Sequence, residues 1–115
     1  FVPKIPSYRI LDIAEAIAPQ CELKNIGIRP GEKIHEEMIT IADSPNTYDL
    51  GDKYVILPND KDLKIKYELS NINIKKVDEG FSYNSYNNEN YLTVEQIRNL
   101  IKSNLDKKYY SHCLK

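Results

Sequence analysis

The first 28 residues change hydrophobic period twice, which limits the chain to a fold that mixes strands with helices. Residues 1–5 (FVPKI) place apolar residues at alternate positions, as a half-buried strand does. Residues 22–28 (ELKNIGI) alternate again, with Gly27 as a candidate bulge. Between them Pro6-Ser7 supply a stop and an N-cap, and apolar residues then recur at helical spacing at Ile10, Leu11, Ile13, Ala14 and Ile17. The order strand, helix, strand predicts part of an α/β or α+β layer.

The middle of the chain predicts a β-hairpin. Before the hairpin, residues 31–39 (GEKIHEEMI) favour a helix, because apolar residues recur at helical spacing and acidic residues near the start suit the helix dipole. That run is so short that a strand remains the alternative. After a turn at residues 43–46, the runs 47–50 (TYDL) and 54–57 (YVIL) are joined by a short loop, which is typical of a hairpin.

The clearest local signal lies near the C-terminus. Residues 93–96 (TVEQ) form a capping box, and Leu92 and Ile97 are placed to form a hydrophobic staple. An apolar stripe continues to Leu105, so a closing helix is predicted from Val94. The tyrosine-punctuated polar residues 83–90 before it favour a loop.

These patterns predict an α/β segment with a small sheet and flanking helices. The chain of 115 residues is one domain at most. We expect three parts: an α/β segment at residues 1–60, a solvated connector at 61–81 with an edge strand near residues 63–67, and a C-terminal extension at 82–115 with the capped helix.

Composition excludes several classes of protein. The net charge of −1 provides no basic field for nucleic acid or an anionic membrane. No apolar stretch is long enough to span a bilayer, and residues 1–4 do not resemble a signal peptide, so we expect a cytoplasmic protein. Because the chain starts with Phe1 inside a predicted strand, we expect a segment of a longer polypeptide.

The sequence carries no recognisable catalytic or metal-binding motif. Cys21 and Cys113 lie 92 positions apart, which fits neither a zinc site nor a disulfide scaffold, so we expect buried or bystander thiols. His112 is far from His35. His35 and Glu36 could form a proton-transfer pair, but adjacent helix residues do not face each other, so a surface or packed histidine is favoured.

Residues 28–36 (IRPGEKIHE) predict an anion site. Arg29 offers a planar fork of donors that matches phosphate oxygens, and Pro30-Gly31 forms a turn that can hold it at the mouth of a cleft. Glu32 could accept hydrogen bonds from the hydroxyl groups of the same ligand. Alternatively, Glu32 is a first-turn helix carboxylate and Arg29 its surface partner, which would stabilise little.

Five ordered segments give the chain a resemblance to a known family. They are FVPKIPS, LDIAEAIAP, IGIRPGEKIHEEMIT, NTYDLGDKYVILP and SYNSYNNENYLTVEQIRNLI. Together they resemble the C-terminal part of the C5-inverting UDP-N-acetylglucosamine 4,6-dehydratases of bacterial capsule, flagellin-glycan and lipopolysaccharide pathways. These enzymes are extended short-chain dehydrogenase/reductases. The resemblance is weakest between residues 61 and 80.

The resemblance implies that this chain is the substrate-binding part of a larger enzyme. NADP and the catalytic Asp, Lys and Tyr would belong to a Rossmann domain that is absent from this chain, so no cofactor, metal or catalytic residue is expected here. Arg29 would bind the diphosphate of a UDP-sugar and Glu32 its ribose. The resemblance also implies a homo-oligomer, a hexamer in this family, and a segment at residues 83–90 that packs back on the core or on a neighbouring subunit.

Two other interpretations remain open. The chain could belong to another extended-family enzyme acting on a UDP-sugar, such as a C5-retaining dehydratase or an epimerase, because the residues that separate these reactions lie in the missing domain. It could also be a stand-alone, non-enzymatic binding or oligomerisation module. The sequence begins with Phe1 rather than with Met, which favours a segment of an enzyme over such a module.

Overall fold

The computed structural model describes residues 1–59, 61–62, 65–66, 70 and 74–106. The chain divides into two compact units, and each unit is built from two separate stretches of sequence. Unit 1 contains Phe1–Ile5 and His35–Asn88, and unit 2 contains Pro6–Ile34 and Glu89–Lys115.

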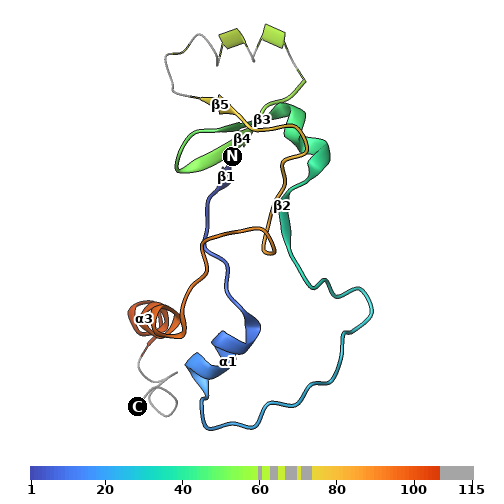
Figure 1. Ribbon diagram of the computed structural model, residues 1–115. Coiled ribbons are helices and arrows are strands. Elements are labelled where there is room, and N and C mark those ends of the chain that lie inside the picture. Colours follow the sequence, from blue (N-terminus) through green and yellow to red (C-terminus); the bar gives the residue numbers. More distant parts are fainter. Residues whose placement is uncertain (60, 63–64, 67–69, 71–73, 107–115) are drawn as a thin grey trace. The chain divides into compact units, whose positions relative to one another are not determined.

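Unit 1 is built on antiparallel strands (Figure 1). One sheet has the strand order β1-β4-β3-β5, in which β1 is Val2–Pro3, β4 is Lys53–Ile56, β3 is Thr47–Asp49 and β5 is Lys75–Lys76. A second sheet pairs β2 (Glu37–Ile39) with β6 (Tyr83–Asn84). The 3-10 helix η1 (Ile41–Asn46) connects β2 to β3.

The predicted hairpin is confirmed as β3 and β4. Tyr48 pairs with Val55, and the Leu50 amide donates to the Lys53 carbonyl across the turn at 2.9 Å. Gly51 adopts φ +94° in that turn, a conformation that favours glycine. Tyr48, Val55 and Leu57 are buried together and form a hydrophobic core, against which Leu50 and Ile74 pack. The strand predicted at residues 1–5 is also confirmed, because β1 pairs with β4.

Unit 2 contains the helices α1 (Ile10–Ile17) and α3 (Val94–Asn104), which pack against each other. Ala16 of α1 and Ile97 of α3 are buried. The Arg98 side chain donates to the carbonyl oxygens of Glu15 (3.1 Å) and Ala16 (3.4 Å). These carbonyls lie at the C-terminal end of α1, where the helix dipole favours a cation.

The capping box of α3 is confirmed. The Thr93 hydroxyl accepts from the Gln96 amide at 3.2 Å, and the Gln96 side chain accepts from the Thr93 amide at 2.8 Å. Each interaction satisfies an amide that a helix start would otherwise leave unpaired. Among the residues that the structure describes, no helix has the length and apolar character that crossing a bilayer requires.

The N-cap predicted at Ser7 is wrong. The cap residue of α1 is Arg9, whose side chain makes no capping hydrogen bond. Ser7 instead donates its amide to the Asn90 carbonyl and accepts from the Leu92 amide, both at 2.8 Å. These bonds form a parallel bridge to Tyr91. The backbone of Ser7 is thus committed to a partner that lies more than eighty residues away in the sequence.

The strand predicted at residues 22–28 is also wrong, because this stretch has no regular secondary structure. The helix predicted at residues 31–39 is wrong as well, and the strand alternative holds for β2. Tyr83 and Asn84 supply the pairing partner of β2, and Ile39 becomes fully buried. A partner so distant in sequence leaves no trace in a local pattern.

Two smaller predictions need correction. The turn expected at residues 43–46 is part of η1. In the connector, residues 63, 64 and 67 lie outside the described part of the chain, whereas Ile65 and Lys66 are helical and therefore form no edge strand. An edge strand does occur, but later, as β5.

The division at residues 1–60, 61–81 and 82–115 stays a prediction. The mixture of helices with a small sheet confirms the predicted α/β class.

Candidate functional site

The predicted anion site is a tight turn in unit 2. The Glu32 amide donates to the Arg29 carbonyl at 3.1 Å. Pro30 and Gly31 occupy the two central positions, and Gly31 has φ +82°. Proline followed by a residue with positive φ is the pattern of a type II turn. The predicted turn at Pro30-Gly31 is therefore confirmed.

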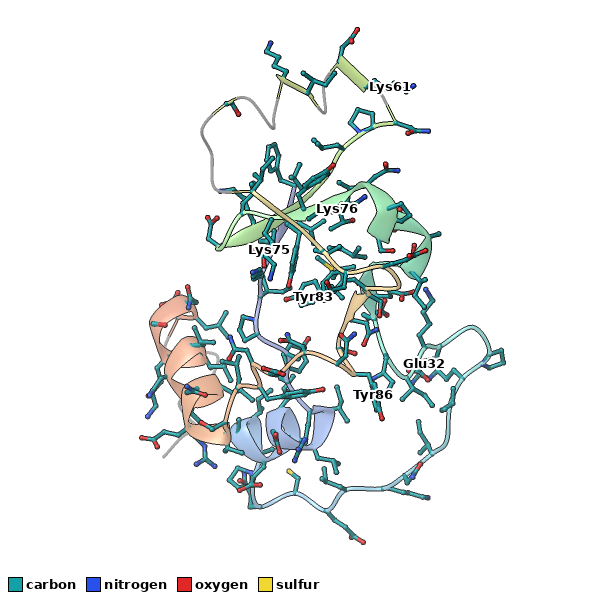
Figure 2. The ribbon with its side chains drawn as sticks, turned by 45° about the horizontal axis from the view of Figure 1, so that its top comes forward. Glu32, Lys61, Lys75, Lys76, Tyr83 and Tyr86 are labelled. Carbon is teal, nitrogen blue, oxygen red and sulfur yellow. The ribbon has the colours of Figure 1, made fainter. Side chains whose placement is uncertain are left out.

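A second hydrogen bond, between the Arg29 backbone and the Glu32 side chain, also closes this turn. The Arg29 amide donates to one carboxylate oxygen of Glu32, Oε2, at 2.8 Å. Figure 2 shows Glu32 on the loop that precedes β2. The structure thus brings the two predicted site residues together, through the backbone of Arg29. It does not show the surface ion pair or the first-turn helix carboxylate that formed the alternative.

The side chains at this turn are accessible. Arg29 and Glu32 are both exposed. The contact with Glu32 uses the amide of Arg29, and no hydrogen bond or ion pair to the guanidinium occurs within the described part of the chain. One carboxylate oxygen of Glu32 receives the turn hydrogen bond, which leaves the other as an acceptor. The turn can therefore present a cationic fork beside an acceptor.

His35 belongs to a separate cluster, in unit 1. Its Nδ1 lies 3.2 Å from the Ser85 hydroxyl, and its ring meets the edge of Tyr86 at 5.1 Å between centroids. The Ser85 hydroxyl also accepts from the Glu36 amide at 3.1 Å. The Ser85 amide donates to the Glu36 carbonyl at 2.8 Å. These contacts connect the chain before β2 to the turn after β6, which favours the packing role of His35 over proton transfer with Glu36.

Tyr83 is a structural residue that the sequence did not reveal. Its hydroxyl accepts from the Ile5 amide (2.9 Å) and donates to the Ile5 carbonyl (2.8 Å). The Asn88 side chain donates to the same carbonyl at 2.8 Å. Tyr83 is buried, and its ring lies 5.4 Å from that of Tyr54 (Figure 2). The loop expected at residues 83–90 thus begins as the strand β6, and its residues up to Asn88 are part of unit 1.

The shifted pKa values that the structure resolves lie in unit 1. The Lys4 ammonium is 2.7 Å from Asp49 and 4.6 Å from the centre of the Tyr54 ring. Its hydrogen bond to Asp49 raises the pKa of Lys4. Burial acts to raise the pKa of Asp49, but hydrogen bonds from Lys4 and the Gly51 amide outweigh it, so that pKa is lowered. This pair joins Lys4, the residue after β1, to Asp49 of β3 and has a structural role.

The described part of the chain contains no candidate metal centre. No group of three or more His, Cys, Asp or Glu side chains there is arranged to hold an ion. Cys21 is exposed with a free thiol, as expected of a bystander. Cys113 and His112 lie outside the described residues.

Curated relatives confirm the resemblance that rested on five sequence segments. Over 105 residues, the chain is 42% identical to the UDP-N-acetylglucosamine 4,6-dehydratase (inverting) of Campylobacter jejuni serotype O:2. It is 41% identical to the protein of the same name from serotype O:23/36. Each alignment covers 88% of this chain and 31% of the relative. The chain therefore spans less than a third of the length of these relatives.

A solved structure and a family profile agree with this comparison. The X-ray structure of Pen from Bacillus thuringiensis superposes with a TM-score of 0.62 at 26% identity, covering 88% of this chain and 30% of that chain. Residues 1–58 match the profile of the polysaccharide biosynthesis protein family. That match includes the Arg29 turn, the hairpin and half of the chain. This chain belongs to the polysaccharide biosynthesis protein family.

Proposed function

We propose that this chain is the C-terminal, nucleotide-sugar-binding part of a C5-inverting UDP-N-acetylglucosamine 4,6-dehydratase that serves bacterial surface polysaccharide or glycan biosynthesis. The relatives carry this activity in their names and share about two residues in five with the chain. The observation that carries the proposal is the turn at Arg29–Glu32, which bonds the Arg29 backbone to the Glu32 carboxylate and leaves the guanidinium without a partner among the described residues.

In this proposal Arg29 binds the diphosphate of the UDP-sugar. A guanidinium can donate two parallel hydrogen bonds to phosphate oxygens, and both partners are charged, which makes such bonds strong. The available oxygen of Glu32 accepts a ribose hydroxyl. Because two hydrogen bonds already close the turn, little backbone freedom within residues 29–32 is lost when the ligand binds, and this preorganisation favours affinity.

The chemical steps would take place outside this chain. A Rossmann domain of the same polypeptide would bind NADP, and this cofactor would supply the hydride chemistry at C4 and C6 of the sugar that accompanies loss of water across C5 and C6 and inversion at C5. Arg29 and Glu32 would hold the nucleotide and orient the sugar toward that domain, which lowers the entropic part of the barrier. The proposed enzyme is a cytoplasmic homo-oligomer, a hexamer, with no nucleic-acid or membrane partner.

Replacing Arg29 tests the site directly. In the polypeptide that joins this chain to its Rossmann domain, Arg29→Ala should weaken UDP binding about 10- to 100-fold, because hydrogen bonds between charged groups contribute about 1.5–3 kcal/mol. Isothermal titration calorimetry with UDP measures this change. Lys33→Ala is the matched control, since it removes another exposed cation close in sequence. An unchanged dissociation constant for Arg29→Ala would rule out the assignment.

Glu32 can be tested separately from the turn that it closes. Glu32→Gln retains an oxygen that can accept from the Arg29 amide, whereas Glu32→Ala removes it. We expect the alanine variant to lose more UDP affinity than the glutamine variant. Equal affinities for both variants and the parent would remove Glu32 from the site.

The coding sequence upstream of Phe1 separates this proposal from the alternatives. A segment of a dehydratase requires an in-frame glycine-rich strand-turn-helix of a Rossmann domain. A start codon directly before Phe1 would instead favour a stand-alone module. Assay of the full polypeptide with UDP-N-acetylglucosamine, with the C5 configuration of the product read by NMR, distinguishes inverting from retaining dehydratases and from epimerases.

A further inference from the structure

Residues 22–28 combine a strand-like sequence with an exposed, irregular conformation. Every residue of this stretch is exposed, and the side chains of Leu23, Ile26 and Ile28 are 57%, 73% and 63% accessible. In Figure 1 this part of the chain runs as an open loop after α1. In an extended strand, Leu23 would face one side while Ile26 and Ile28 faced the other. A strand with apolar residues on both sides is suited to burial on both faces.

The backbone of the same stretch is largely free to pair. The Gly27 amide donates to the Asn25 side chain at 2.8 Å. Within the described residues, no backbone group of residues 22–28 has a hydrogen bond to another backbone group. Gly27 adopts φ +78°, which is the glycine conformation of one common β-bulge. The segment could therefore join a sheet with a bulge at Gly27 and without strain.

We propose that residues 22–28 form a β-strand by pairing with an exposed sheet edge in the part of the polypeptide that lies outside this chain, so that Arg29 stands at the end of a fixed strand. The inference rests on the proposed function, because the curated relatives are more than three times as long as their aligned part. Addition of a strand to a sheet edge pairs the free backbone and covers the apolar side chains together.

The pairing would also explain how a turn on an open loop could bind a nucleotide tightly. Arg29 follows Ile28 directly, so a strand that ends at Ile28 restricts the position of the guanidinium. Without the pairing, the backbone of about seven residues would have to become ordered when the ligand binds. The loss of conformational entropy would cost about 1–2 kcal/mol for each of these residues.

Hydrogen–deuterium exchange, read by mass spectrometry on peptides covering residues 22–28, tests the pairing. The measurement compares the chain alone with the longer polypeptide. We expect the amides of this stretch to exchange at least about 100-fold more slowly in the longer polypeptide, because paired strands open rarely. Amides of α3 serve as the internal control, since they are paired in both samples. Equally fast exchange of residues 22–28 in both samples would overturn the inference.

Two adjacent proline variants test whether the protection reflects a strand. Adjacent residues of a strand direct their N–H groups to opposite sides, so one of Leu23 and Lys24 donates to the partner strand. Proline has no N–H, so either Leu23→Pro or Lys24→Pro must remove a hydrogen bond to that partner. We expect one variant to lose the protection in the longer polypeptide and neither to change the thermal unfolding of the chain alone. Protection that survives both substitutions, or that appears in the chain alone as its concentration rises, contradicts pairing with the outside region.

Calorimetry on the same samples separates this inference from the proposed function. UDP binding by a polypeptide whose residues 22–28 stay unprotected would refute the strand and leave the nucleotide site intact. Protection without any UDP binding would support the strand and refute the nucleotide site.

Discussion

The β3–β4 hairpin and residues 22–28 start from similar sequence patterns and reach different structures. The sequence predicts strands in both stretches, yet only the hairpin forms them. Tyr48 and Val55 find each other across a turn of a few residues and are buried, at 6% and 4% accessibility. Ile26 remains 73% accessible. The comparison teaches that a strand-like sequence does not make a strand by itself, because a pairing partner decides whether the strand exists.

The largest expected difference between these regions concerns two isoleucines. Ile39 of β2 is fully buried, so Ile39→Ala should lower the free energy of unfolding by about 2–5 kcal/mol. Ile26→Ala removes the same atoms from an exposed side chain and should change it by less than about 0.5 kcal/mol. Urea denaturation of the chain, followed by circular dichroism, measures both. Similar losses for the two variants would contradict the exposure assigned to residues 22–28.

A smaller effect is expected from the Tyr83 hydroxyl. Tyr83→Phe leaves the ring in place but removes both hydrogen bonds to Ile5, so we expect a loss of about 1–3 kcal/mol. Tyr86→Phe is the matched control, because Tyr86 is 75% accessible. If the two variants unfold at the same urea concentration, the connection between β6 and the end of β1 contributes no stability.

The smallest effect should be a pH dependence of unit 1. The pKa of Asp49 is lowered in the folded chain, so its stabilising contribution is complete above the unfolded value of about 4 and is lost as the pH falls through the lower, folded value. We expect less than about 1 kcal/mol, since the pair with Lys4 is partly exposed. Asp49→Asn should flatten the fall of the thermal midpoint with acid. An identical acid profile in the variant would exclude this contribution.

The fold was predictable where pairing and capping are local. The Thr93 capping box, the hairpin and the Arg29 turn each depend on residues within a few positions, and all three are confirmed. Two predictions failed because a distant partner intervened, although the strand at residues 1–5 is confirmed with β4 as its distant partner. Ser7 bonds to residues near Tyr91, and β2 pairs with β6, so a local cap and a local helix gave way to long-range hydrogen bonds.

The candidate site divides in the same way. Arg29 and Glu32 could be named from the sequence, because a proline and a glycine between them dictate a turn. The hydrogen bond from the Arg29 amide to the Glu32 carboxylate could not be predicted from the sequence, since Glu32 was expected to lie in the first turn of a helix. The contacts of His35 with Ser85 and Tyr86 span fifty residues and became visible only in the structure.

The sequence by itself determined the family, the turn residues and the helix start at Thr93, because each depends on residue identity at short spacing. The tertiary structure decided which apolar segments are buried and which strands pair. A strand satisfies its backbone only through a neighbour, and that neighbour can lie anywhere in the chain, as β6 does for β2. For residues 22–28 no neighbour is present in the described part of this chain, and their exposure follows directly.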